Sequence, residues 1–300
     1  MIYNVRQLSR RTLDVMYKMH VRSCIDYCIQ VFGPSLNSTQ IDKLDKLQYR
    51  AARITTKAMK FTSKQKIFID LGWESIEKRI EFLSLCLFHK IHIYETRPQI
   101  RECRPPINLY PNFTRSNKFY SNYTEKNTDF CNSFFPKISK IWNELPFDLR
   151  NKDMIEFKIE LSQKLKPYKN KLYSIGSKFG NSIHTQLRVG RSQLNDHLFS
   201  VRLSPSAKCL CGNLETTEHF LLDCFLYEIE RQQLFTELPG VLEKSIDKYN
   251  RNELVHVLLH GEYSDNPEKY EHNKVLFRYV QKFLIQTKRL VYKSRLQYIP

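Results

Sequence analysis

The 300-residue sequence lacks several motifs that carry catalytic chemistry. It contains neither an Asp-Asp pair nor a glycine-rich phosphate loop, and no apolar run approaches the roughly 20 residues that cross a bilayer. Acidic residues are also few, because 31 Asp and Glu accompany 48 Lys and Arg and leave a formal net charge of +17. We therefore expect a polyanionic partner, and neither intrinsic catalysis, a small-molecule substrate nor a membrane.

The remaining composition is that of a folded chain. Hydrophobic residues make up 41% and aromatic residues 13%, which suffices for packed cores, and the length predicts two domains. The eight cysteines are scattered except for three near residue 210, a pattern typical of a reducing compartment, the nucleus or the cytoplasm. Cys24 and Cys28 lie in a segment of helical periodicity, residues 9–32, and are expected in the core.

One cluster of cysteine and histidine has the composition of a metal site. Cys209, Cys211, His219 and Cys224 occur in the spacing C-x-C-x7-H-x4-C. Zn²⁺ prefers thiolate sulfur and imidazole nitrogen in closed four-coordinate sites, and these residues supply a full set of four ligands. The pattern predicts a structural zinc site. The alternative is that the same side chains are ordinary loop and core residues.

The second half of this motif constrains the local helix. Thr216 or Thr217 can cap a helix that presents His219. His219 and Cys224 are five residues apart, and a regular helix rotates such a pair by about 140°. We therefore expect the helix to end or loosen near Leu222.

The residues around the cluster also have a family resemblance. The segment SQLNDHLFSVRLSPSAKCLCGNLETTEHFLLDC resembles the C-terminal CCHC region of reverse transcriptases from non-LTR retrotransposons of the LINE and jockey type. The positions that match its pattern are Glu215, Glu218, His219, Leu222 and Cys224.

Three earlier segments resemble the thumb and the passage that follows it in the same enzymes. They are MYKMHVRSCIDYCIQVFGPSL, IDKLDKLQYRAARITTKAMK and NSFFPKISKIWNELPFDLR. The resemblance implies a mainly α-helical fold. Its expected parts are a thumb-like helical domain at 1–96, a connector at 97–150, a basic helix and linker at 151–180, and a C-terminal helical domain at 181–300 that contains the knuckle 209–224.

The resemblance implies a function as well. In this family the thumb holds the RNA template with its DNA primer, and the CCHC region grips element RNA or target DNA. The palm carboxylates that catalyse RNA-directed DNA synthesis are absent, so we expect a non-catalytic C-terminal part of a longer polymerase, either a truncated element or a partial gene model starting at Met1. The alternative is a helical protein-interaction or scaffold module that binds neither metal nor nucleic acid.

Two helices are predicted to carry rows of basic side chains that follow a phosphate backbone. One begins after Ser38 or Thr39 and places Leu47 on its apolar face, and the other spans residues 268–297. A solvated basic face is the alternative for each row. The candidate nucleic-acid contacts on these helices and beside the cysteine cluster are Lys46, Arg50, Arg53, Lys57, Arg202, Lys208, Arg231, Lys274, Arg278, Lys282, Arg289 and Lys293.

Aromatic residues of the expected connector alternate with Arg and Lys. This pattern suits stacking on unpaired bases, or a basic loop packed onto the helices. The aromatic candidates are Tyr110, Phe113, Phe119, Tyr120 and Tyr123. Trp73 is predicted to anchor the core, and His89 and His92 to be partly exposed helix residues.

Overall fold

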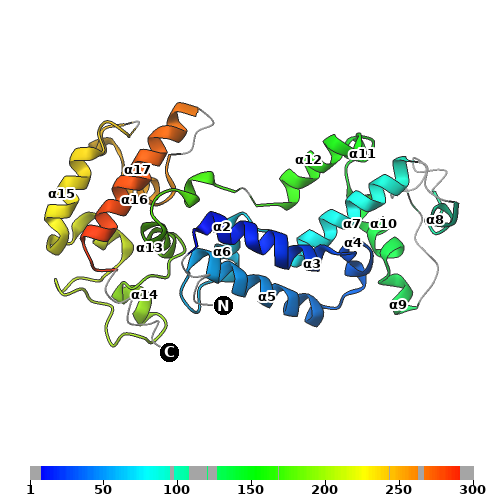
Figure 1. Ribbon diagram of the computed structural model, residues 1–300, viewed down its shortest axis with the longest axis horizontal. Coiled ribbons are helices and arrows are strands. Elements are labelled where there is room, and N and C mark those ends of the chain that lie inside the picture. Colours follow the sequence, from blue (N-terminus) through cyan, green and yellow to red (C-terminus); the bar gives the residue numbers. More distant parts are fainter. Residues whose placement is uncertain are drawn as a thin grey trace. The chain divides into compact units, whose positions relative to one another are not determined.

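The fold is mainly α-helical, as the sequence predicts (Figure 1). A computed structural model describes residues 8–94, 98–107, 120, 127–167, 169–242, 244–262 and 267–290. Within these ranges the regular elements are helices, and β pairing is limited to two isolated bridges, Ile107 with Tyr120 and Lys208 with Leu214. None of the described helices combines the length and apolar character needed to cross a membrane.

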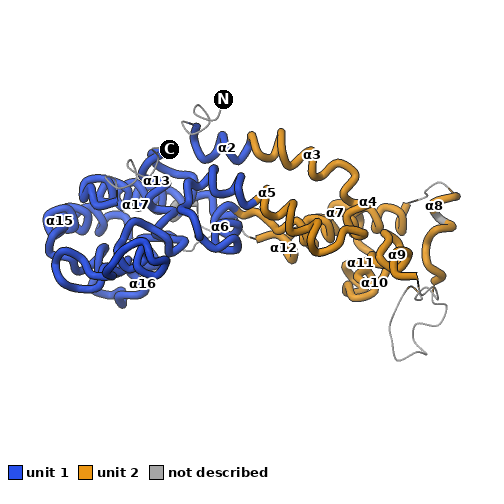
Figure 2. Tube along the Cα trace, turned by 90° about the horizontal axis from the view of Figure 1, so that it is seen from below, with its two compact units in different colours: residues 1–15, 49–71, 169–300 blue, residues 16–48, 72–168 orange. Residues whose placement is uncertain are grey.

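The chain divides into two compact units, and both are discontinuous in sequence (Figure 2). Unit 1 contains residues 1–15, 49–71 and 169–300, and unit 2 contains residues 16–48 and 72–168. Helix α5 (Ser38–Thr56) therefore contributes to both. The expected domains were continuous segments, because sequence periodicity does not show which distant helices pack together.

Unit 2 has an aromatic core. Phe88 lies with its ring centroid 5.2 Å from that of Trp142, which is fully buried. Trp73 is 1% exposed and stacks on Tyr17 at 4.1 Å, which confirms it as a core anchor. Besides part of α5, the helices of this unit are η1 (Tyr17–Arg22), α3 (Ser23–Asp26), α4 (Ile29–Phe32), η2 (Gly33–Ser35), α7 (Ile76–Ile93), α8 (Pro98–Glu102), α9 (Thr128–Cys131), α10 (Phe134–Glu144), α11 (Phe147–Arg150) and α12 (Met154–Leu165).

Unit 1 carries the cysteine cluster. Its core is aliphatic with several Phe, among them Phe220, Phe277 and Phe283, which are at most 1% exposed. Besides part of α5, its helices are α2 (Arg10–Met16), α6 (Lys64–Leu71), η3 (Lys171–Ser174), α13 (Lys178–Arg188), α14 (Asn195–Phe199), η4 (His219–Asp223), η5 (Phe225–Tyr227), α15 (Glu228–Glu237), η6 (Ile246–Lys248), α16 (Arg251–His260) and α17 (Pro267–Gln286).

The helix expected over residues 9–32 is interrupted. Cys28 adopts a left-handed backbone conformation with φ of 55°, and Tyr27 before it is extended, so α3 ends and α4 starts in a new direction. Cys24 and Cys28 are both exposed, and the expectation that they lie in the core was wrong. Leu47 is also exposed, while its neighbour Gln48 is buried and accepts a 2.8 Å hydrogen bond from Tyr17.

Helices form the second part of the expected connector, residues 97–150. Residues 127–150 form α9, α10 and α11. Tyr120 is 1% exposed and its hydroxyl lies 2.8 Å from Nδ1 of His92, so it is a core residue and not an exposed stacking platform. The other four aromatic candidates lie outside the described residues. His89 is fully buried, contrary to expectation, because its ring stacks on Phe157 at 4.1 Å.

Candidate metal centre

A short β-ribbon presents the first two cysteines. The isolated bridge between Lys208 and Leu214 closes it, and the backbone N–H of Cys209 donates to the carbonyl of Asn213 at 2.7 Å. Gly212 has φ of 94°, a conformation that a side chain would strain, and it lets the chain reverse directly after Cys211. The ribbon thus brings both sulfur atoms to one end.

A widened helical turn presents the other two ligands. Thr216 Oγ1 accepts a 3.1 Å hydrogen bond from the backbone N–H of His219 and so caps the helix, as the sequence predicts. Next comes the π-helical turn η4, in which the N–H of Cys224 donates to the carbonyl of His219 at 2.8 Å. This hydrogen bond joins residues five apart, so the turn holds more residues than an α turn and returns Cys224 to the side of His219.

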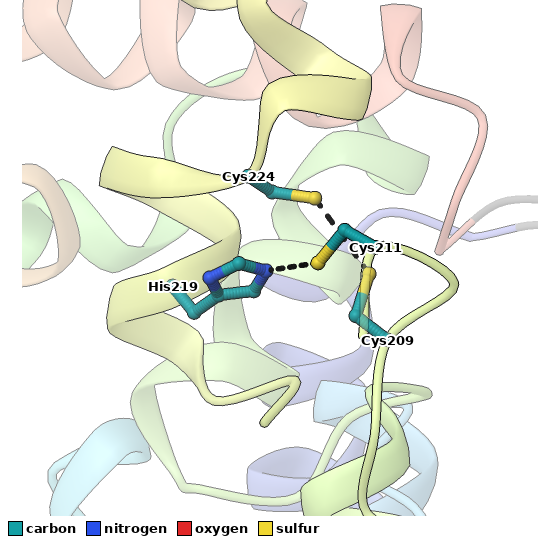
Figure 3. A group of neighbouring side chains, drawn as sticks. All are labelled: Cys209, Cys211, His219 and Cys224. Carbon is teal, nitrogen blue, oxygen red and sulfur yellow. Dashed lines mark hydrogen bonds between the residues drawn. The ribbon is translucent and has the colours of Figure 1, made fainter. Parts of the chain in front are cut away.

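These two segments bring the four predicted ligands together. One ligand atom from each of Cys209, Cys211, His219 and Cys224 lies within 4.8 Å of the others. Figure 3 shows Cys209 and Cys211 on the ribbon loop opposite His219 and Cys224. Cys211 Sγ is 3.1 Å from His219 Nε2, and Cys209 Sγ is 3.6 Å from Cys224 Sγ. The cluster is compact enough to hold a metal ion.

The three thiols of the cluster differ in the direction of their pKa shifts. Burial raises the pKa of Cys224 to about 12 and also raises that of Cys209. Burial acts in the same direction on Cys211, but the backbone N–H of Asn213 donates to its sulfur and the pKa is lowered overall. The Cys224 thiol therefore keeps its proton at neutral pH unless a cation displaces it.

A buried ion pair between Glu215 and Arg289 holds the end of the ribbon in place. Glu215 is 1% exposed and accepts hydrogen bonds from Arg289 Nε at 2.6 Å and from the backbone N–H of Asn195 at 2.5 Å. The side-chain Nδ2 of Asn195 in turn donates to the backbone carbonyl of Lys208 at 2.6 Å. Asn195 and Arg289 thus fix the ribbon through Lys208 and Glu215.

Two further arginines hold the π turn, and sequence reasoning missed both roles. Arg231 is 3% exposed and donates to the carbonyls of Leu221 at 3.0 Å and Cys224 at 2.6 Å. It therefore satisfies carbonyls at the end of the turn, and the prediction that it meets phosphate was wrong. Arg251, at the start of α16, donates to Glu218 at 2.7 Å and to Asp223 at 2.6 Å.

The predicted basic row on α5 is incomplete. Lys46 and Arg50 are exposed, but Arg53 is half-buried with its guanidinium 5.8 Å from the centre of the Tyr49 ring. Lys57 follows the end of the helix with φ of 54° and leaves the row. Burial, and then the charge of Lys178, lower its pKa to about 8.

The row on α17 is mostly paired with acidic residues. Lys274 pairs with Glu271 at 2.5 Å and Lys282 with Glu237 at 2.6 Å, while Arg289 belongs to the Glu215 brace. Arg278 is exposed. The helix ends at Gln286, earlier than predicted, and Lys293 lies outside the described residues. Beside the cluster, Arg202 and Lys208 are exposed as expected.

Comparisons with known proteins add no identification. No family model matches the chain, and neither the curated proteins nor the solved structures provide a match.

Proposed function

We propose that Cys209, Cys211, His219 and Cys224 hold a structural Zn²⁺ and that the chain binds RNA or DNA. The observation that carries the proposal is the convergence of these ligand atoms within 4.8 Å of one another. Three sulfurs and one imidazole nitrogen favour zinc over harder cations such as Mg²⁺ or Ca²⁺. A closed set of four protein ligands is typical of a structural zinc and leaves no position for a reacting water.

Charge supports the second half of the proposal. The formal net charge is +17, and Lys46, Arg50, Arg202, Lys208 and Arg278 are exposed candidates for phosphate contacts. Lys208 belongs to the ribbon and directly precedes Cys209, so a bound metal that orders the ribbon also fixes where this cation lies. Together with the resemblance of the sequence to thumb and CCHC regions, this favours the role of such regions in a non-LTR retrotransposon reverse transcriptase, without catalysis by this chain.

Metal analysis tests the first half. We expect one zinc per chain in protein purified without chelator, and loss of that zinc in Cys211→Ser. Cys24→Ser removes an exposed thiol outside the cluster and serves as the matched control. Wild-type protein that is folded but metal-free after incubation with Zn²⁺ would refute the site.

Binding of a fluorescent RNA oligonucleotide tests the second half. Because phosphate contacts release counterions, the logarithm of the binding constant should fall linearly with the logarithm of salt concentration, and Lys208→Ala should reduce that slope. Binding that Cys211→Ser weakens and Cys24→Ser leaves unchanged would connect the metal centre to the nucleic acid. A zinc-loaded protein without salt-dependent affinity for RNA or DNA would instead favour the protein-interaction module.

A further inference from the structure

Arg251 makes a contact that depends on the register of the π turn. Its guanidinium bridges two carboxylates, Glu218 through Nε at 2.7 Å and Asp223 through Nη2 at 2.6 Å. Glu218 directly precedes the ligand His219, and Asp223 directly precedes the ligand Cys224. The acidic pair and the ligand pair therefore have the same separation of five residues and share one turn.

This separation makes the bridge specific for the widened turn. In a regular α-helix, side chains five residues apart differ by about 140° around the axis, too far for one planar guanidinium to contact both. In η4 the hydrogen bond from Cys224 N–H to the His219 carbonyl brings such positions back to the same side. Arg251 therefore stabilises the register that also places His219 and Cys224 together, and it does so from another helix.

We infer that Arg251 is a positioning residue for the metal centre, which prepares the His219 and Cys224 half of the site for the ion by bridging Glu218 and Asp223. The inference rests on the proposed metal site and adds the residue that sets its geometry. Groups that orient the ligands of a metal commonly change its affinity by one to two orders of magnitude, and the Arg251 side chain is 59% exposed. We expect the lower end, a loss of about tenfold in affinity when Arg251 is replaced.

Electrostatics alone predicts the opposite sign. Removing a cation near the cluster, and leaving two carboxylates without a counter-charge, would attract a divalent ion more strongly. A weaker site in Arg251→Gln therefore indicates lost geometry. Arg251→Lys separates the effect of charge from the effect of geometry. A lysine keeps the positive charge, but its compact ammonium cannot span both carboxylates as a guanidinium does.

The experiment compares the zinc affinity of the full chain and of three variants, by competition with a chromophoric chelator. Lys152→Gln is the matched control, because Lys152 forms a surface ion pair with Glu160 of the same 2.7 Å length in unit 2. We expect Arg251→Gln and Arg251→Lys to bind zinc about tenfold more weakly and Lys152→Gln to match wild type. The absorption spectrum of the Co²⁺-loaded protein, which reports ligand geometry, should change in the two Arg251 variants alone.

Each result decides a separate point. Equal or tighter zinc binding by Arg251→Gln, with wild type binding one ion, overturns the positioning role and leaves the metal site standing. Full recovery in Arg251→Lys would show that any cation beside Glu218 and Asp223 suffices, and it overturns the claim that a guanidinium bridge sets the geometry. Wild-type protein that binds neither Zn²⁺ nor Co²⁺ overturns the metal site itself and the inference with it.

Discussion

The role of Arg289 in unit 1 is set by the residues that it contacts. Arg289 was predicted to face phosphate because it continues a basic row in the sequence. Its guanidinium instead lies against Glu215, whose side chain is 2% exposed, and it also donates to Asn195 at 3.2 Å. Contact with Glu215, an acid from a distant segment, thus makes this candidate phosphate-binding residue a support of the candidate metal centre.

The first prediction concerns this brace. Arg289→Met should lower the free energy of unfolding by about 3 kcal/mol, because it leaves the Glu215 carboxylate buried without its partner. Arg278→Met, on the exposed side of α17, should change it by less than about 0.5 kcal/mol. Urea unfolding followed by circular dichroism measures both. Equal stability of the two variants would show that the Glu215 contact contributes nothing.

The second prediction concerns a histidine of unit 2. Burial lowers the pKa of His92 to about 4, and the nearby charges of Arg104, His89 and Arg150 act in the same direction. In the unfolded chain His92 titrates near pH 6.5, so unfolding takes up a proton between pH 6.5 and about 4. The free energy of unfolding should therefore fall as pH falls through this window, by at most about 1.4 kcal/mol per pH unit.

The imidazole signals of His92 in NMR spectra measure this titration directly. We expect a midpoint near pH 4 for His92. His92→Gln should remove its share of the pH dependence of unfolding. A His92 midpoint near 6.5 would show that its half-buried ring is not desolvated enough to lower the pKa.

At the scale of one element, the π turn η4 explains how His219 and Cys224, five residues apart, come to lie on the same side. The x4 spacing between His219 and Cys224 is wrong for an α-helix and suits an i to i+5 hydrogen bond. The arginines that hold the turn come from the two helices α15 and α16. Correct placement of α16 is therefore a condition for the proposed role of Arg251.

The third prediction tests the start of α16. Asn250 caps the helix by accepting from the backbone N–H of Glu253 at 2.8 Å, and the Glu253 side chain accepts from the N–H of Asn250 at 3.1 Å. Asn250→Ala should cost about 1 kcal/mol of unfolding free energy. Asn252→Ala, two residues further along and exposed, is the control and should stay close to wild type. Chemical denaturation of both variants decides whether the cap matters.

At the scale of the whole molecule, the two units separate the proposed metal centre from the aromatic core. Both tryptophans, Trp73 and Trp142, lie in unit 2, and all four candidate metal ligands lie in unit 1. Phe220 and Leu221 belong to the π turn and are buried in the core of unit 1. Loss of a metal should therefore loosen the packing of unit 1 and leave the surroundings of the tryptophans unchanged.

The fourth prediction follows from that separation. Removal of zinc by EDTA should lower the thermal midpoint seen by circular dichroism at 222 nm. The midpoint seen by tryptophan fluorescence should shift much less, since fluorescence reports on unit 2. Cys211→Ser should behave as the EDTA-treated protein does, and Cys24→Ser as the untreated one. Identical shifts by both probes would show that the units unfold together.

The residues of the cysteine and histidine cluster were predictable from the sequence, and the structure brings them together. Three cysteines and a histidine within sixteen residues form a pattern that is typical of zinc sites. Thr216 was recognisable as a helix cap by its residue type and its position. The basic rows were less predictable. Helical periodicity places Lys282 and Lys274 on one face of α17, but it carries no information on Glu237, which approaches Lys282 from α15.

Local chemistry determined the helical class of this protein, its basic charge and its candidate metal ligands, because these depend on residue types at short separations. Tertiary structure alone decided the discontinuous units, the burial of His89 and Tyr120, and the partners of Arg231, Arg251 and Arg289. Each of these depends on which residue of a distant segment packs against the side chain. Tertiary packing decides this, and no short stretch of sequence records it.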